Sequence, residues 1–236
     1  MSIAENIAAI RANMNAAAIA CGRDPKSILL CAATKMNDAD AVRAAIAAGV
    51  DLCGENRVQE LTAKLAENAY AGAPVHFIGH LQTNKVRQVV GKVDLIQSVD
   101  SLRLLTAIDK EAARQGIRQD ILLEVNIGAE ETKSGFAPAE IPAVAENFSD
   151  FPNLRLRGLM AIPPVAQNPG DNDKFFQEMY NLSVDITAKK GDNVCADILS
   201  MVMSDDYVSA ITHGSTMIRV GTAIFGARHY NTNHQN

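Results

Sequence analysis

The 236-residue sequence contains only four cysteines, and no two of them stand at a spacing that suggests a shared role. Cys21, Cys31, Cys53 and Cys195 are far apart, and the chain has neither a CxxC pair nor a regular disulfide framework. Disulfide-stabilised and zinc-stabilised folds are therefore disfavoured, and we expect a reducing compartment, the cytoplasm.

Positive charge and long hydrophobic runs are also scarce. The chain has 22 Lys and Arg against 27 Asp and Glu, which gives a formal net charge of −5 and a pI near 5.5. This balance argues against nucleic acid or an anionic membrane as the main partner. The N-terminal stretch carries Glu5 and Arg11 within its apolar pattern, so we expect neither a signal peptide nor a membrane-spanning segment there.

What the sequence does have is a regular succession of short apolar runs. Isoleucine, methionine and alanine at helical spacing first predict an amphipathic helix over residues 3 to about 21. Eight apolar segments then predict strands at 27–35, 50–56, 75–82, 93–101, 120–128, 154–162, 195–204 and 217–226. The segments between them predict helices at 39–48, 102–114, 171–189 and 205–211. Three more helices are predicted with one bound each: one that ends near residue 68, one that begins near 84 and one that begins near 138.

This alternation of strands and helices predicts a parallel sheet with helices outside it. Eight strands in a chain of this length predict an α/β fold, the closed (β/α)₈ (TIM) barrel, here preceded by an extra N-terminal helix. An open doubly wound sheet is the alternative. No linker or repeat divides the chain, so we expect residues 1–236 to form one domain with a flexible tail from about residue 229.

The first predicted strand, SILLCAATK, ends on Lys35. Its apolar residues leave no polar face, which predicts a strand buried on both sides. A lysine at the end of such a strand has its amine at the edge of a dry core, where desolvation lowers the pKa and frees the lone pair to attack a carbonyl. The alternative is a lysine whose stem lies along apolar surface while its amine reaches solvent.

The last two predicted strands end in residues suited to phosphate. Barrels often bind phosphate in the loops after strands 7 and 8, at the N–H groups of a short helix. Gly221 and Thr222 follow the buried eighth strand, and Ser200 and Ser204 would supply hydroxyls beside them from the seventh. The alternative is a glycine-rich turn that only closes the barrel.

Arg219 lies within the eighth strand between two apolar residues. A buried arginine needs a polar or anionic partner, which would be either Asp or Glu in a structural ion pair or a ligand at the barrel mouth. Lys35, a phosphate site and Arg219 together suggest pyridoxal phosphate (PLP). Its aldehyde would form a Schiff base with Lys35, and Arg219 would face the pyridine nitrogen and keep it unprotonated.

The sequence also resembles a known family along nearly its whole length. The matching stretches, in order, are TK at 34–35, GENRVQE at 54–60, HFIGHLQTNK at 76–85, SVDS at 98–101, VN at 125–126, KSGF at 133–136, RGLMAI at 157–162, SMVMSDD at 200–206 and HGSTMIRVGTAIFGAR at 213–228. They resemble the pyridoxal phosphate homeostasis proteins, whose single-domain barrel is similar to the N-terminal domain of alanine racemase. The resemblance implies PLP bound through the lysine, no enzymatic turnover, and a role in buffering and delivering the cofactor that keeps vitamin B6 and amino-acid pools in balance.

Position by position, the resemblance implies a Schiff base at Lys35 and cofactor contacts by Asn56, Ser200, Met203, Ser204, Arg219, Gly221 and Thr222. Three residues depart from the family pattern, because Thr34, Asn37 and Val202 stand where serine, proline and glycine are usual. Val202 brings a β-branched side chain, which disfavours a positive φ, to the expected phosphate loop.

Two enzyme classes are alternatives to a non-catalytic binder. A racemase-like enzyme needs a proton-transfer group on each face of the cofactor, and His80, His213 or Tyr207 would have to supply the second. In alanine racemases a tyrosine from an additional domain does so. A Schiff-base aldolase acting on a sugar phosphate needs a carboxylate near the lysine, for which Glu55 and Glu124 are the candidates. Because no second domain follows the eighth strand, we expect a monomer whose cofactor is open to solvent and passes transiently to PLP-dependent apoenzymes.

Overall fold

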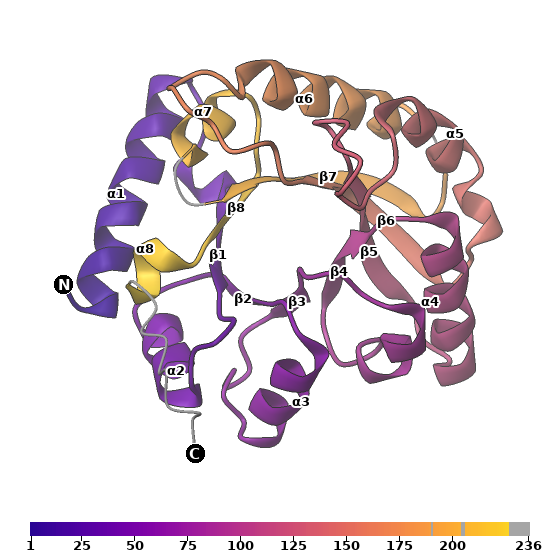
Figure 1. Ribbon diagram of the computed structural model, residues 1–236, viewed down its shortest axis with the longest axis horizontal. Coiled ribbons are helices and arrows are strands. Elements are labelled where there is room, and N and C mark those ends of the chain that lie inside the picture. The colour runs from indigo at the N-terminus through magenta and orange to yellow at the C-terminus, as the bar shows by residue number, and fades with distance from the viewer. Residues whose placement is uncertain (190, 204–205, 227–236) are drawn as a thin grey trace.

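Eight parallel strands close into a barrel in the order in which they occur in the chain (Figure 1). The structure is a computed structural model that describes residues 1–189, 191–203 and 206–226, so the tail expected from about residue 229 lies outside the described residues. The strands are β1 (Leu29–Ala33), β2 (Leu52–Glu55), β3 (Val75–Phe77), β4 (Leu95–Val99), β5 (Gln119–Val125), β6 (Leu154–Ala161), β7 (Val194–Met203) and β8 (Met217–Val220). The pairing of β1 with β8 confirms the predicted (β/α)₈ barrel and excludes an open sheet.

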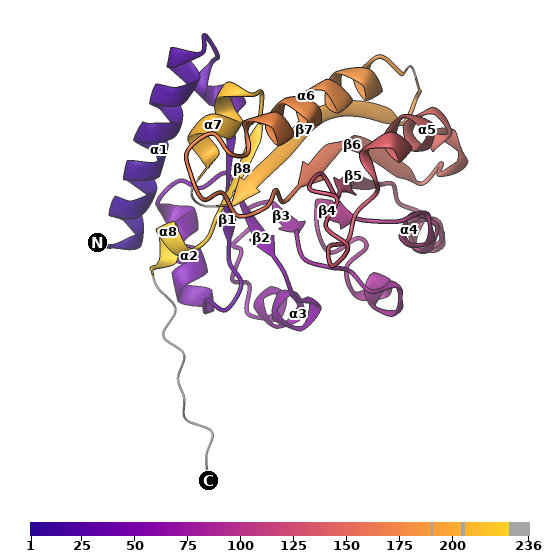
Figure 2. The same cartoon turned by 45° about the horizontal axis from the view of Figure 1, so that its top comes forward.

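Helices surround the barrel on its outer side (Figures 1 and 2). The α-helices are α1 (Ile3–Ala20), α2 (Ala39–Ala47), α3 (Val58–Ala66), α4 (Leu102–Gln115), α5 (Ile141–Glu146), α6 (Asp173–Thr187), α7 (Tyr207–Thr212) and α8 (Thr222–Phe225). Short 3₁₀ helices lie at Pro25–Ser27, Thr83–Gln88, Pro138–Glu140 and Phe148–Asp150.

Local sequence signals explain where several helices begin and end. Ser2 and Glu5 form a capping box, in which each side chain accepts the backbone N–H of the other residue. The Asp38 carboxylate caps α2 by accepting the Ala41 N–H. At the end of α4, Gly116 adopts the left-handed conformation that glycine reaches without strain.

The extra N-terminal helix α1 covers the outside of β8 and β1 (Figure 2). Its buried residues Ile7, Ile10 and Met14 belong to the same apolar cluster as Leu30 on β1 and Ile218 on β8. Because α8 has only four residues, it cannot shield these two strands. We infer that α1 provides the apolar cover that a longer eighth helix would supply.

The barrel interior is apolar toward the amino ends of the strands and polar toward their carboxyl ends. Two small apolar clusters fill the first part, with side chains from β1, β2, β4, β5, β6, β7 and β8. One of them contains Cys31, whose thiol pKa is raised by burial. Two positions further along β4, β7 and β8 come Gln97, Ser200 and Arg219, which are all buried.

Three segments differ most from the sequence predictions. The third strand ends at Phe77 instead of continuing to residue 82, because the chain at Gly79 turns against the Asn56 backbone. Residues 83–88 form a 3₁₀ helix instead of the predicted α-helix, and this tighter winding brings Val86 and Val89, three residues apart, together into the core. The eighth strand ends at Val220 instead of continuing to residue 226, because Gly221 begins the short helix α8.

Candidate functional site

The carboxyl ends of β7, β8 and β1 bring several of the sequence-predicted residues together. Arg219 on β8 pairs in backbone register with Met203 on β7. Gly221 lies beside the end of β1, since a Cβ added there would be 3.5 Å from the Ala33 Cβ. Lys35 follows Ala33 by two residues and is half-buried. The side chain of Met203 and the whole of Ser204 lie outside the described residues.

The end of β2 adds Asn56 to the same rim. The N–H and the Oγ1 of Thr34 both donate to the Gly54 carbonyl, at 2.9 and 3.2 Å, which ties the residue before Lys35 to β2. A Cβ added at Gly79 would lie 2.1 Å from the Asn56 carbonyl oxygen, so only glycine allows the loop after β3 to approach so closely. Asn56 Oδ1 is buried and has no hydrogen-bond partner among the described residues.

Lys35 occupies a strained turn just beyond β1, rather than the end of the strand itself. Met36, the next residue, has φ 63°, a left-handed backbone conformation that residues other than glycine rarely adopt. The Met36 N–H donates to Glu60 Oε2 at 2.6 Å. Asn37 Nδ2 donates to the Lys35 carbonyl at 3.0 Å. The backbone around the lysine is therefore held from outside the turn as well as from within it.

Arg219 is buried inside the barrel, where neutral oxygens accept its hydrogen bonds. Nη1 donates to Ser200 Oγ at 2.6 Å, and Nη2 donates to the Ala161 carbonyl at 3.1 Å. Burial lowers the pKa of the guanidinium, while the nearby Cys31 and Glu124 act in the opposite direction. Within the described residues Arg219 forms no ion pair, so the structural partner that the sequence left open is not found there.

A row of hydrogen bonds continues from Arg219 across the barrel. Ser200 Oγ donates to Gln97 Oε1 at 2.8 Å, and Gln97 Nε2 lies 2.9 Å from His76 Nδ1. Burial lowers the pKa of His76 to about 4, so its ring is neutral near pH 7 and Nδ1 accepts the amide proton. Neither Gln97 nor His76 was predicted as a site residue from the sequence. The available signal was a polar residue inside each of two apolar strands.

The two carboxylates considered for an aldolase have different surroundings. Glu55 is fully buried between β2 and α3, where its Oε2 lies 2.6 Å from Lys64 Nζ. This ion pair holds the Glu55 carboxylate away from the barrel interior. Burial raises the pKa of Glu124, an effect strengthened by Asp100 and opposed by Arg219.

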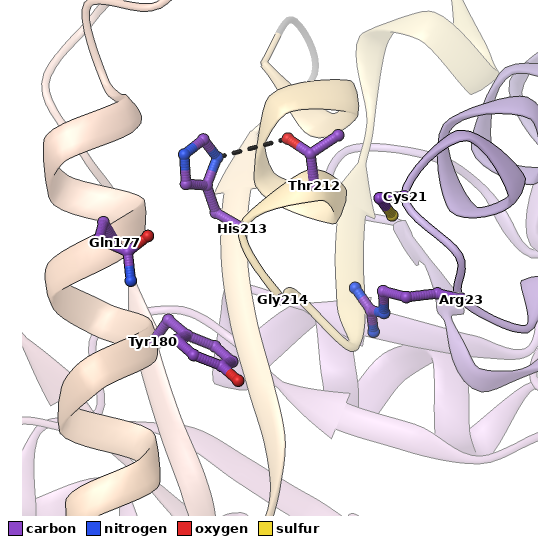
Figure 3. A pocket seen from close by; sticks show the side chains of 7 residues that line it. All are labelled: Cys21, Arg23, Gln177, Tyr180, Thr212, His213 and Gly214. Atoms are coloured by element: carbon purple, nitrogen blue, oxygen red, sulfur yellow. Dashed lines mark hydrogen bonds between the residues drawn. The ribbon is translucent and has the colours of Figure 1, made fainter.

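His213, considered as a second proton-transfer group, follows α7 and precedes β8, at the pocket drawn in Figure 3. Its Nδ1 is 2.8 Å from the Ser209 carbonyl oxygen, which accepts from it. It lines a pocket of about 420 Å³ with Cys21, Arg23 and Tyr180 among its other residues. Because these residues precede β1 or β8 or lie on α6, the pocket belongs to the amino ends of those strands. His213 therefore cannot serve a site at the opposite end.

Of the other two groups considered for this role, only His80 lies on the carboxyl rim. The Tyr207 hydroxyl accepts from Asn13 Nδ2 of α1 at 3.1 Å, outside the barrel. His80 follows β3, and its Nδ1 lies 3.3 Å from Asp100 Oδ2 after β4. Among the described residues no cluster of three or more His, Cys, Asp or Glu could hold a metal ion.

Comparison with known proteins agrees with this architecture. Residues 6–229 match the family described as alanine racemase, N-terminal domain. The pyridoxal phosphate homeostasis protein of Pseudomonas aeruginosa is 42% identical over 229 residues, which cover 97% of each chain. That of Escherichia coli is 40% identical over 231 residues, again 97% of each chain.

The chain therefore belongs to the family of barrels that share the alanine racemase N-terminal domain. Within it, the chain belongs to the pyridoxal phosphate homeostasis proteins. Among solved structures, PipY of Synechococcus elongatus with PLP bound has a TM-score of 0.81 at 33% identity, covering 95% of this chain and 100% of that one. In the described part of this chain, no helix has the length and apolar character needed to cross a membrane.

Proposed function

We propose that this chain binds PLP at the carboxyl ends of β7, β8, β1 and β2 and acts as a non-catalytic protein that buffers and delivers the cofactor. One observation carries the proposal: Lys35 follows the strand paired with that of Arg219, whose buried charge has no ion-pair partner in the described residues. PipY, with PLP bound in its structure, is similar to this chain over 95% of its length. The pyridoxal phosphate homeostasis proteins named above give the proposed role.

The residues at the rim match the functional parts of PLP. PLP would supply an aldehyde, and the Lys35 amine would hold it as a Schiff base, with loss of water. The first N–H groups of α8, next to Gly221 and Thr222, have no acceptor within the helix and can donate to a phosphate. The buried Asn56 Oδ1 without a partner is an acceptor that a bound ligand would satisfy.

The remaining predicted residues have supporting parts in this proposal. Ser200 Oγ accepts from the Arg219 guanidinium at 2.6 Å. In this proposal, that guanidinium is the group that faces the pyridine nitrogen. Met203 lies beside Arg219 in the backbone register, and we retain it and Ser204 as cofactor contacts. With Lys35, Asn56, Arg219, Gly221 and Thr222, these residues make up the proposed site.

Absence of turnover is part of the proposal. Two of the three groups considered for proton transfer on the second face, His213 and Tyr207, make contacts away from the carboxyl rim. His80 is at the rim, but its side chain is 59% exposed. An exposed group in water is poorly suited to controlled proton transfer at a carbon centre. This supports a carrier over a racemase.

We further propose that the chain acts in the cytoplasm and passes PLP to apoenzymes in transient encounters. Its four cysteines, Cys21, Cys31, Cys53 and Cys195, are all free, as is usual in a reducing compartment. We place the transfer at the rim because the proposed cofactor contacts are there.

The test is to load the purified protein with PLP, record its visible spectrum, reduce it with borohydride and locate the adduct by peptide mass spectrometry. We expect a yellow protein with the adduct on Lys35. Lys35→Ala should lose this adduct. Lys26→Ala, which removes an exposed lysine before the other end of β1, should keep the adduct on Lys35. An adduct scattered over surface lysines would contradict the cofactor site. Racemisation of amino acids by the loaded protein would contradict the carrier role.

A further inference from the structure

A buried cluster of charged side chains lies between β2 and α3, directly beside the turn that carries Lys35. Lys64 of α3 is 6% exposed, and its Nζ donates to Glu55 Oε2 at 2.6 Å and to the Thr34 carbonyl at 2.7 Å. Glu55 Oε2 also lies 3.1 Å from Thr34 Oγ1, whose one proton it shares with the Gly54 carbonyl, and it accepts from the Tyr70 hydroxyl at 3.4 Å. None of these side chains has a part in the proposed cofactor contacts.

Glu60 extends the cluster to the residue after Lys35. Its Oε2 lies 3.4 Å from Lys64 Nζ and accepts the Met36 N–H at 2.6 Å. Met36 is the residue with φ 63°, so its peptide needs an external partner to stay in this conformation. The backbone is thus held on both sides of the lysine, at the Thr34 carbonyl by Lys64 and at the Met36 N–H by Glu60.

The same cluster also holds the backbone of Asn56. The Asn56 N–H donates to Glu55 Oε1 at 2.9 Å, while the other oxygen of that carboxylate binds Lys64. Asn56 and Lys35 come from neighbouring strands and are both proposed cofactor contacts. One set of three charged side chains therefore fixes the backbone at two positions of the proposed site.

Stability alone does not account for burying these charges. A buried ion pair gains little over apolar side chains of similar size, because taking both charges out of water offsets their attraction. What a carboxylate and an ammonium provide, and apolar groups do not, is directed hydrogen bonding to chosen backbone atoms. Here the chosen atoms flank Lys35 and Asn56.

We propose that Glu55, Glu60 and Lys64 are positioning residues for Lys35: they touch no cofactor atom but set where the lysine amine lies. This inference rests on the proposed function, since it concerns the lysine that would bond to PLP. It assigns a part to Glu55 and Glu60 of the stretch GENRVQE, of which the cofactor site uses only Asn56.

The test uses Glu60, which lies at the outer edge of the cluster with 22% of its side chain exposed. Glu60→Ala removes the acceptor of the Met36 N–H. Glu60→Gln keeps the reach without the charge, and Glu60→Asp keeps the charge but shortens the reach by one methylene. Gln59→Ala, at an exposed position of the same helix, is the matched control.

The measurement is the rate at which PLP enters Lys35, followed by borohydride trapping and peptide mass spectrometry, with thermal melting to confirm that each variant is folded. We expect Glu60→Ala and Glu60→Asp to slow incorporation by about tenfold, because a small displacement of a reacting group has a large effect on its rate. Glu60→Gln should stay within about threefold of the unsubstituted protein, since its amide oxygen still accepts the N–H. Amide hydrogen exchange of residues 34–38 should rise in the two slow variants only.

Equal rates in Glu60→Ala, Glu60→Asp and Gln59→Ala would overturn the positioning role and leave the cofactor site standing. Equal slowing by Glu60→Gln and Glu60→Ala would also overturn it, because charge and not reach would then be responsible. If Glu60→Ala does not fold, the comparison of Glu60→Asp with Glu60→Gln decides. No adduct on Lys35 in the unsubstituted protein would overturn both proposals.

Discussion

Arg219 keeps its charge inside the barrel at one end of a row of side chains in which each has a fixed donor or acceptor role. Arg219 donates to Ser200, Ser200 donates to Gln97, and the Gln97 amide donates to His76. The last acceptor must be an unprotonated nitrogen, which the low pKa of His76, about 4, provides. Protonation of the His76 imidazole would therefore remove the last hydrogen-bond acceptor of this row.

At the residue scale, we expect His76 to make the protein less stable in mild acid. The pKa of His76 is lowered from 6.5 to about 4 by folding, so between these values the unfolded chain binds a proton that the folded chain does not. The free energy of unfolding should fall as pH drops from about 6.5 toward 4, by roughly 3 kcal/mol in total at 1.36 kcal/mol per pKa unit.

Urea unfolding at several pH values, compared between the unsubstituted protein and His76→Asn, isolates this contribution because the carboxylates titrate alike in both. Asparagine places an acceptor near the position of Nδ1, so the row is preserved. His80→Asn, at an exposed histidine, is the control for removal of an imidazole and should keep the fall in stability that His76 causes. A pH dependence that is unchanged in His76→Asn would show that another group is responsible.

The loop after β3 touches the chain just beyond β2, where Gly79 lies against the backbone of Asn56. A Cβ added at Gly79 would be 2.1 Å from the Asn56 carbonyl oxygen and 2.7 Å from its Cα, both of them backbone atoms that cannot rotate away. The two loops can therefore touch only if residue 79 has no side chain. The position of Asn56 depends on that contact.

At the element scale, we expect Gly79→Ala to destabilise the protein by about 2 kcal/mol, the usual size of an overpacking effect. In a chain of this length that corresponds to a fall in Tm of roughly 4 to 8 °C. PLP binding should weaken as well, since Asn56 moves. Gly191→Ala is the control, because a Cβ there meets nothing nearer than 3.4 Å. Thermal melting and PLP titration of both variants would decide, and equal Tm values would contradict the close contact.

Hydrophobic periodicity was enough to predict the elements but not the interior network. All eight strands and the N-terminal helix follow from apolar runs, because burial of whole faces dominates their formation. Gln97 follows from no such pattern. A register shift between Ile96 and Val99 changes which residues of β4 oppose those of β5, and alternation in a sequence does not reveal it.

At the site, too, the sequence did not predict the contacts that join one element to another. Arg219 stands out in the sequence because it interrupts an apolar strand, and Lys35 because it follows one. The pairing of Glu55 with Lys64 joins a strand to a helix nine residues later, and no local spacing rule covers it. For Asn56, the role of cofactor contact came from the family resemblance alone.

At the scale of the whole molecule, we expect a monomer with or without PLP. The described residues of the proposed site, Lys35, Asn56, Arg219 and Gly221 among them, follow or lie on the neighbouring strands β8, β1 and β2 of one barrel, which is the basis of this expectation. Sedimentation equilibrium should give a mass near 25.3 kDa in both states. An obligate dimer whose partner contributes a residue to the PLP site would contradict both the monomer and the open cofactor.

The one-way order of donors from Arg219 to His76 also restricts how this barrel can be redesigned. Ser200 has one proton to give, and Gln97 has one orientation that serves both neighbours. A glutamate at position 97 would have no N–H for His76, and an alanine at position 200 would leave Arg219 and Gln97 without their shared hydroxyl. Anyone who grafts a new ligand site into this interior must therefore exchange the four side chains as a set.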